Sequence, residues 1–204
     1  MEKEHILRRI GKCIVSSCIL AYCKVVYRVK IIGKENVPKE GALIFCGNHR
    51  TYLDPPLIVV TAGRDMRFFA KEELRTNPLF AFLGFLYRGI YVKRDSKDIG
   101  PLKEGLKELK SGGCVGLFPE GTRNGMAKSE DGKLKNGASY MAIKTGAKIV
   151  PIGIVGPAKP FTKNAIIYGK PIDLAEHNLL EKGSEDKASE LLKTEIVKLS
   201  ETVI

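Results

Sequence analysis

Tryptophan is absent from the 204-residue chain, and aromatic residues make up only 7% of it. Proteins that bind single-stranded nucleic acid stack the bases on aromatic side chains, so this scarcity argues against a nucleic-acid partner. The chain also lacks the Gly-x-x-x-x-Gly-Lys-Ser/Thr loop and the Gly-x-Gly-x-x-Gly turn of common nucleotide-binding sites. No serine stands in a Gly-x-Ser-x-Gly elbow, so the usual signature of a serine acyl-enzyme is missing.

The cysteines show no Cys-x-x-Cys pair and no histidine at zinc-ligand spacing. They are Cys13, Cys18, Cys23, Cys46 and Cys114. An odd number of thiols is typical of a reduced protein inside the cell rather than of a disulfide framework. We therefore predict no metal site and assign no chemistry to these residues.

Acidic residues are also scarce, because 23 Asp and Glu stand against 34 Lys and Arg, which gives a net charge of +11. A basic protein of this kind favours an anionic partner, such as a phospholipid or an acidic or phosphorylated substrate carrier. The hydrophobic content of 44% over 204 residues suits one well-buried domain and is too small for two ordinary ones.

Long hydrophobic runs are missing too. Residues 13–23 form an apolar run, but it is well short of the roughly 20 residues that a membrane-spanning helix needs. Basic residues lie on both sides of this run, and Ile10, Ile14 and Val25 recur at approximately helical spacing. We predict that residues 1–30 form an amphipathic helix at an anionic membrane interface. A signal peptide and a helix packed on the protein's own core are the alternatives.

Residues 31–204 alternate short apolar runs with helical patterns, which predicts a single α/β domain with a central, mostly parallel or mixed sheet flanked by helices. The predicted strands are residues 42–46, 66–70, 90–93, 114–118, 149–154 and 165–168. The predicted helices are residues 55–62, 78–87, 102–110, 137–145 and 185–202.

A histidine and an aspartate follow the first of these strands, in the segment from Asn48 to Asp54. We expect Asp54 to cap a helix that Pro55 and Pro56 begin. A turn before that helix can bring His49 against the Asp54 carboxylate, which would fix one imidazole nitrogen and leave the other to accept a proton. The pair therefore predicts a general base, and a structural histidine beside a helix cap is the alternative.

A turn that suits an anion follows the strand at residues 114–118. Gly121 permits a tight turn, Arg123 supplies a planar cation for phosphate oxygens, and the Thr122 hydroxyl adds a donor. Glu120 would repel phosphate, so we expect it to pair with an arginine or to accept a substrate hydroxyl. Both this turn and His49 lie after predicted strands, where open α/β sheets place their ligands.

Taken in order, four short blocks make the chain resemble the 1-acyl-sn-glycerol-3-phosphate acyltransferase family, over roughly residues 30–172. The first block, Asn-His-x-x-x-x-Asp, matches Asn48 to Asp54, and the third matches Phe118 to Arg123. The second resembles residues 89–94 and the fourth resembles residues 149–153. One departure is Lys93, because an acidic residue often precedes the family's arginine at Arg94.

The resemblance implies transfer of a fatty acyl group from acyl-CoA or acyl carrier protein to the sn-2 hydroxyl of lysophosphatidic acid, which forms phosphatidic acid. It implies His49 as the base and Asp54 as its orienting partner. It also implies phosphate binding by Arg123 with Gly121 and Thr122; Glu120, Arg94 and Lys71 belong to the same predicted site. Arg88 is an alternative to Arg94. No cofactor or metal is expected, because a thioester is already activated.

A family of this kind implies a monotopic or peripheral enzyme at the cytoplasmic face of a membrane, and the chain is expected to be a minimal member without an additional domain. Another lysolipid or glycerol 3-phosphate is an alternative acceptor. A phosphate-ester hydrolase is an alternative enzyme, although it would commonly need metal ligands that the sequence does not show. A basic, non-enzymatic lipid-binding protein is the remaining alternative.

Overall fold

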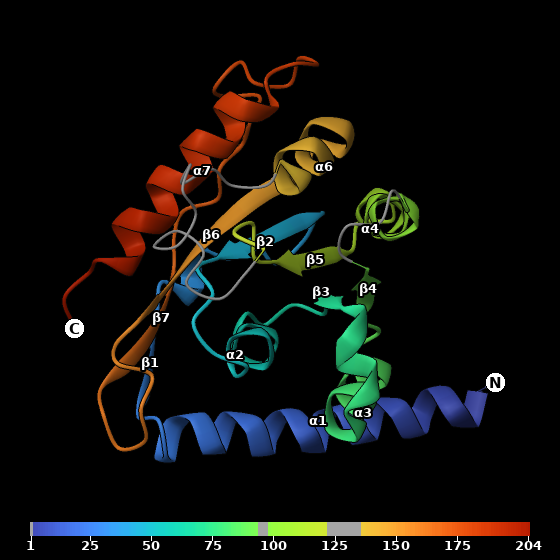
Figure 1. The fold of residues 1–204 in the computed structure, drawn as a ribbon, viewed down its shortest axis with the longest axis vertical. Coiled ribbons are helices and arrows are strands. Elements are labelled where there is room, and N and C mark those ends of the chain that lie inside the picture. The colour runs from blue at the N-terminus through green and yellow to red at the C-terminus, as the bar shows by residue number, and fades with distance from the viewer. Residues whose placement is uncertain (1, 94–97, 122–135) are drawn as a thin grey trace.

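A seven-stranded sheet forms the centre of the molecule, with helices on both of its faces (Figure 1). The computed structural model describes residues 2–93, 98–121 and 136–204. The strands are β1 (Val29–Ile32), β2 (Leu43–Gly47), β3 (Arg67–Lys71), β4 (Ile90–Val92), β5 (Cys114–Leu117), β6 (Lys148–Val155) and β7 (Asn164–Tyr168). The helices are α1 (Glu2–Val25), α2 (Asp54–Thr61), α3 (Pro78–Leu86), α4 (Gly100–Lys110), α6 (Gly137–Thr145) and α7 (Glu185–Ser200), with the short 3₁₀ helices η1 (Lys34–Asn36) and η2 (Glu72–Thr76).

The strand order is β1-β7-β6-β2-β5-β3-β4. Strands β6, β2, β5, β3 and β4 are parallel to one another, whereas β7 is antiparallel to β6 and parallel to β1. The prediction of a mostly parallel α/β sheet is thus confirmed. Because β2 and β5 are central and parallel, the loops that follow them emerge at the same edge of the sheet.

The two faces of β2 show how the layers are built. Ile44 and Cys46 belong to the apolar cluster that α4, α6 and α7 cover, while Leu43 and Phe45 belong to the cluster that α1 and α2 cover. Successive residues of a strand point to opposite faces, so a continuous run of apolar residues is what a strand covered on both faces requires. This burial fixes the register of β2 and, with it, the position of the loop that follows.

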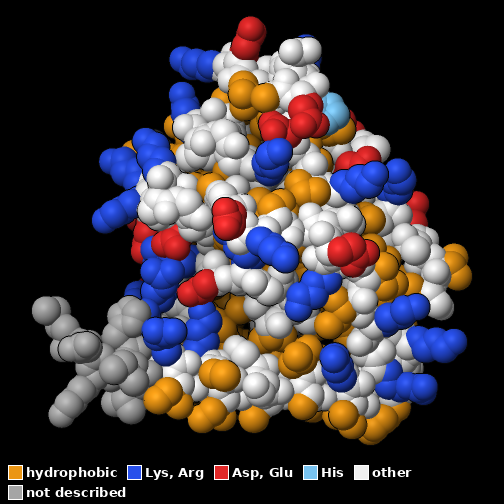
Figure 2. All heavy atoms as spheres, turned by 180° about the vertical axis from the view of Figure 1, so that it is seen from behind, with side chains coloured by type: hydrophobic (Ala, Val, Ile, Leu, Met, Phe, Trp, Pro, Cys, Tyr) orange, Lys and Arg blue, Asp and Glu red, His pale blue; other side chains and the backbone are white. Residues whose placement is uncertain are grey.

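Helix α1 has one face against the body of the protein and another exposed. Cys23 is buried in the core, and the Ser16 hydroxyl is hydrogen-bonded to the Tyr87 hydroxyl at 2.7 Å. The exposed large hydrophobic residues of this helix are Ile10, Ile14, Tyr22 and Val25. Figure 2 shows hydrophobic side chains along the lower edge of the molecule, where α1 runs, with lysine and arginine side chains above them. Within the described ranges, the structure contains no helix whose length and apolar character would let it cross a membrane.

The strands and helices predicted within residues 31–204 agree with the structure to within one or two residues, whereas the helix predicted over residues 1–30 ends at Val25 and strand β1 was missed. It pairs with β7 from Val29 to Ile32, so the boundary expected after residue 30 falls inside a strand of the sheet. The strand has only four residues and lies at the edge of the sheet, and its first two residues had been assigned to the N-terminal helix.

Candidate active site

The candidate site is formed by the loops that follow β2 and β5. These strands are neighbours, and Cys46 pairs with Leu117 near their carboxyl ends. His49 therefore emerges beside Phe118, and the two rings are stacked with their centroids 4.0 Å apart and their planes 3° from parallel. Phe118 also contacts Phe68 of β3 at 5.1 Å between ring centroids. The imidazole thus lies on an apolar surface that limits its orientation.

The loop that carries His49 is attached to β6 by its neighbours in sequence. The Asn48 side-chain amide donates to the Ile154 carbonyl at 3.0 Å, and the Ile154 N–H donates back to Asn48 Oδ1 at 2.7 Å. The Arg50 guanidinium donates to the Gly156 carbonyl. These hydrogen bonds join the first residues after β2 to the next strand of the sheet, so the loop has little freedom to move the histidine.

His49 and Asp54 form the predicted pair. Nδ1 of His49 lies 2.9 Å from Oδ2 of Asp54, and the two side chains are 18% and 4% exposed. Because Nδ1 is directed at a carboxylate, it carries the proton, and Nε2 is the nitrogen that can accept one. The structure therefore contains the predicted contact between His49 and the carboxylate that orients it.

The expectation that Asp54 caps the following helix is wrong. Asp54 is the first residue of α2, and its Oδ2 accepts the N–H groups of Arg50 and Thr51 at 2.6 and 2.7 Å, which precede the helix. Oδ1 accepts the Thr51 hydroxyl at 2.8 Å. The carboxylate thus closes the loop that contains His49, instead of satisfying N–H groups inside the helix. Sequence reasoning gave no role to Thr51, to Asn48 or to the ring of Phe118.

The turn after β5 has the predicted shape in the part that the structure describes. Gly121 has a φ of 67° and its N–H donates to the Phe118 carbonyl at 3.0 Å, a conformation that glycine adopts without strain. Glu120 lies in this turn and is partly buried. Thr122, Arg123 and Arg94 were predicted site residues and lie outside the described residues.

The structure separates the remaining cationic candidates. Lys71 ends β3 and is exposed at the same edge of the sheet as His49. Since β3 is two strands from β2, its end lies about 10 Å from the end of β2, within reach of a long side chain. Arg88 precedes β4 and therefore lies at the amino ends of the parallel strands, opposite to the loop that carries His49. There it pairs with Glu108 at 3.1 Å. The alternative of Arg88 as a substrate-phosphate ligand loses its support.

The buried cysteines have no sign of reactivity. Burial raises the pKa of the Cys46 thiol, which lies three residues before His49, and burial raises the pKa of Cys23 to about 11. A thiol with a raised pKa carries little thiolate and is a poor nucleophile. Over the described ranges, histidine, cysteine and acidic side chains form no group of three or more that is placed to hold a metal ion.

Comparisons with known proteins agree with this geometry. A family model described as Acyltransferase matches residues 28–155. A 1-acyl-sn-glycerol-3-phosphate acyltransferase of Borreliella burgdorferi is 31% identical over 200 residues, which are 94% of this chain and 77% of that protein. Another from Bacillus subtilis is 32% identical over 161 residues, covering 72% and 75% of the two chains.

The fold is also found in a solved structure. The crystal structure of the 1-acyl-sn-glycerophosphate acyltransferase PlsC from Thermotoga maritima matches with a TM-score of 0.70 and 25% identity, over 100% of this chain and 86% of that one. Together with the family model, these matches show that the chain belongs to the acyltransferase family. Both relatives reported above, each at least 31% identical to this chain, are 1-acyl-sn-glycerol-3-phosphate acyltransferases.

Proposed function

We propose that this protein transfers a fatty acyl group from an acyl thioester to the sn-2 hydroxyl of 1-acyl-sn-glycerol 3-phosphate and so forms phosphatidic acid. The observation that carries the proposal is the His49 imidazole, hydrogen-bonded through Nδ1 to the buried Asp54 carboxylate at 2.9 Å. In a chain of the acyltransferase family, such a pair supplies the base that an alcohol acceptor needs.

The proposed reaction is direct. Nε2 of His49 takes the proton from the sn-2 hydroxyl while the hydroxyl oxygen forms a bond with the thioester carbonyl carbon. The Asp54 carboxylate stabilises the imidazolium that results. The carbon–sulfur bond then breaks, and the proton passes from the imidazolium to the departing thiolate. Backbone N–H groups would stabilise the tetrahedral oxyanion between these steps.

Arg123 is the proposed ligand of the acceptor phosphate, with Gly121 and Thr122 supplying neutral donors, and Lys71 and Arg94 as further cations. The position of Lys71 at the His49 edge of the sheet supports this assignment. Glu120 would accept a hydroxyl of the acceptor or pair with an arginine.

The first prediction concerns Arg123. Arg123→Ala is expected to raise the KM for lysophosphatidic acid roughly 10- to 100-fold, because a charge-assisted hydrogen bond to phosphate contributes about 1.5–3 kcal/mol. The measurement uses a short-chain acceptor that is soluble without vesicles. Arg88→Ala is the matched control, since Arg88 lies at the opposite edge of the sheet, and its KM should stay near that of the wild type. Equal increases in the two variants would move the phosphate site away from Arg123.

The donor is proposed to be acyl-CoA or acyl carrier protein, since both are anionic and suit a basic protein. The chemistry as written needs no cofactor, because the thioester supplies an activated carbonyl. Both kinds of donor belong to the cell interior, and this supports an enzyme that acts at the cytoplasmic face of a membrane.

We also propose that α1 contacts that membrane through its exposed apolar face. Ile10, Ile14, Tyr22 and Val25 are exposed along it. Phe161 extends the face at the carboxyl end of α1, where its N–H donates to the Val26 carbonyl at 2.5 Å. Lys24, in the last turn of α1, is exposed, so it can reach anionic headgroups. A helix of this composition suits the interface of a bilayer.

The second prediction tests this face. Ile14→Glu is expected to weaken binding to anionic vesicles at least tenfold, because it removes an apolar side chain worth about 1.5–3 kcal/mol on burial and adds a negative charge. Leu180→Glu is the matched control, since Leu180 is also an exposed hydrophobic residue but lies outside α1. Cosedimentation with vesicles measures the difference. If both variants bind like the wild type, α1 is not the membrane contact.

The function itself is tested with a labelled acyl group presented on each donor in turn and with a set of acceptors. Lysophosphatidic acid should be acylated in preference to glycerol 3-phosphate and to other lysolipids. A preference for another acceptor would keep the reaction and change the substrate. Vesicle binding without any acyl transfer would instead favour a non-enzymatic lipid-binding protein.

A further inference from the structure

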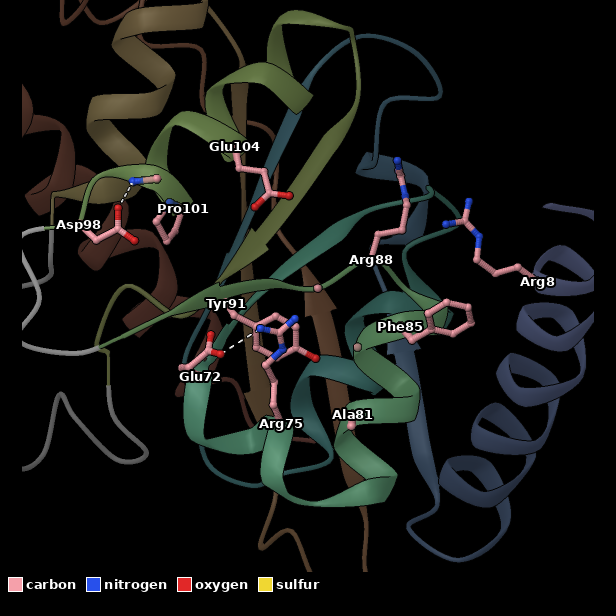
Figure 3. A pocket seen from close by; sticks show the side chains of 13 residues that line it. Arg8, Glu72, Arg75, Ala81, Phe85, Arg88, Tyr91, Asp98, Pro101 and Glu104 are labelled. Carbon is pink, nitrogen blue, oxygen red and sulfur yellow. Dashed lines mark hydrogen bonds and ion pairs between the residues drawn. The ribbon is translucent and has the colours of Figure 1, made fainter. Parts of the chain in front are cut away.

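A pocket that does not include His49 lies beside β4, the last strand of the sheet (Figure 3). It has a volume of about 800 Å³, and its walls come from α1, η2, α3, β4 and the start of α4. Because β4 ends the sheet and is three strands from β2, this pocket is separate from the candidate active site. Ligand pockets commonly have volumes of this order.

Two arginines enter the pocket from the side of α1. Arg8 projects from α1 and Arg88 from the turn before β4, and Figure 3 shows their guanidinium groups on the same side of the pocket. Among the residues whose side chains the structure describes, which begin at Arg8, none forms an ion pair with Arg8. Arg88 uses Nη2 for Glu108 at 3.1 Å, yet its side chain is 39% exposed. Since a guanidinium has five N–H donors, Arg88 keeps donors for an external anion.

The acidic residues of the pocket have partners within the protein. Glu72 pairs with Arg75 at 3.0 Å, and Glu104 pairs with Arg67. Asp98 accepts the N–H of Gly100 at 2.7 Å at the start of α4. Figure 3 shows Glu72 and Asp98 on the side away from Arg8. The positive charge on the α1 side is therefore the charge that is available to a ligand.

Apolar surface adjoins these arginines. Phe85 of α3 lines the pocket and is 59% exposed, and Leu79 and Phe82 are exposed on the same helix. Helix α3 packs against α1, because a Cβ atom at Gly11 would lie 3.7 Å from the Leu86 side chain. Ile10 on the exposed face of α1 is close in sequence to both Arg8 and Gly11. Guanidinium groups beside an exposed apolar surface match the two chemical parts of a phospholipid.

We propose that this pocket binds the headgroup of an anionic phospholipid, with the phosphate on Arg8 and Arg88 and the acyl chains along Phe85 and Phe82. The site depends on the membrane contact proposed for α1, but it does not depend on acyl transfer. It is distinct from the acceptor-phosphate site proposed at Arg123, because Arg8 and Arg88 belong to α1 and to the turn before β4, whereas Arg123 belongs to the segment after β5. Bilayer lipid bound here would attach the amino-terminal end of α1 and the end of α3 to the same leaflet.

The test uses dihexanoyl phosphatidylglycerol kept below its micelle-forming concentration, because a dissolved monomer has no charged membrane surface that attracts every basic residue. Binding is followed by NMR titration of the full chain. Arg8→Gln is expected to weaken binding roughly tenfold or more, as loss of a charge-assisted hydrogen bond to phosphate implies. Arg9→Gln is the matched control, since Arg9 is the next residue, has the same charge and does not line the pocket, and it should change binding less than twofold.

The outcomes separate the possible ligands. Equal losses in Arg8→Gln and Arg9→Gln, or no binding of the lipid monomer, would overturn the proposal. Inorganic phosphate that binds as tightly as the lipid would also overturn it, because the acyl chains would then add nothing. Arg88→Gln should reproduce the Arg8→Gln result. The Arg8 variant remains informative even if loss of the Arg88–Glu108 pair destabilises the fold, because Arg8 does not take part in that pair.

Failure of the proposed enzymatic function would look different. Arg8→Gln should transfer acyl groups to a soluble short-chain acceptor at the wild-type rate, because the pocket is remote from His49. If the wild type transferred no acyl group while the difference between Arg8→Gln and Arg9→Gln persisted, the headgroup site would stand and the acyltransferase proposal would fail.

Discussion

Replacing His49 with alanine is expected to lower kcat for acyl transfer by about 10² to 10⁴-fold, which is the usual contribution of a positioned general base. The fold should survive, because Asp54 still accepts the N–H groups of Arg50 and Thr51 and the Thr51 hydroxyl. Initial rates of phosphatidic acid formation at saturating acceptor measure the loss, and circular dichroism checks the fold.

His177→Ala is the control for this experiment. His177 is exposed and precedes α7, outside the candidate site, so its removal should leave the rate unchanged. A His49→Ala variant that forms product at the wild-type rate would show that the hydroxyl is not deprotonated by His49, and the direct mechanism would be wrong.

Asp54→Asn is expected to lower kcat by about 10³ to 10⁴-fold while the protein still folds. The substitution keeps the size of the side chain but removes the charge that stabilises the imidazolium, and it allows the amide to fix the wrong imidazole tautomer. Asparagine has one oxygen, whereas the Asp54 carboxylate accepts hydrogen bonds on both of its oxygens. At least one donor is lost, so the free energy of unfolding should fall by about 1–3 kcal/mol.

The kinetic effect and the stability effect of Asp54 can be separated. Asp65→Asn is the control, because Asp65 is an exposed carboxylate paired with Lys12 on the surface, and neither kcat nor the unfolding midpoint should change much. Denaturant unfolding and steady-state kinetics give the two quantities. If Asp54→Asn kept more than about a tenth of the wild-type kcat, orientation of His49 by a charged partner would not be needed.

The sequence predicted the layers of the fold well because the central strands are apolar on both faces. Strand β2 is a continuous buried run, which is typical of a strand covered by helices on both sides. Strand β1 was missed because it has only four residues, too few for a clear period, and because its first two residues were assigned to the preceding helix. The antiparallel pairing of β6 with β7 depends on contacts between distant segments, which local periodicity does not encode.

The pair of His49 and Asp54 was predicted from the sequence, whereas the residues that hold this pair in place were not. The spacing of His49 and Asp54 indicated a contact, and the structure contains it. The stacking of His49 on Phe118 was not foreseen, because it depends on the register between β2 and β5. The helix cap expected at Asp54 was wrong, because its carboxylate accepts the N–H groups of Arg50 and Thr51, which precede the helix.

The central claim is direct transfer from thioester to hydroxyl with His49 as the base, and counting the products of one reaction tests it most directly. Purified protein is incubated with a labelled acyl thioester, with and without lysophosphatidic acid, and the free thiol, the fatty acid and the phosphatidic acid are measured together. The account predicts one phosphatidic acid for each thiol released, and no thiol release without the acceptor. A burst of thiol in the absence of lysophosphatidic acid, or thiol release that yields free fatty acid in its presence, would contradict it.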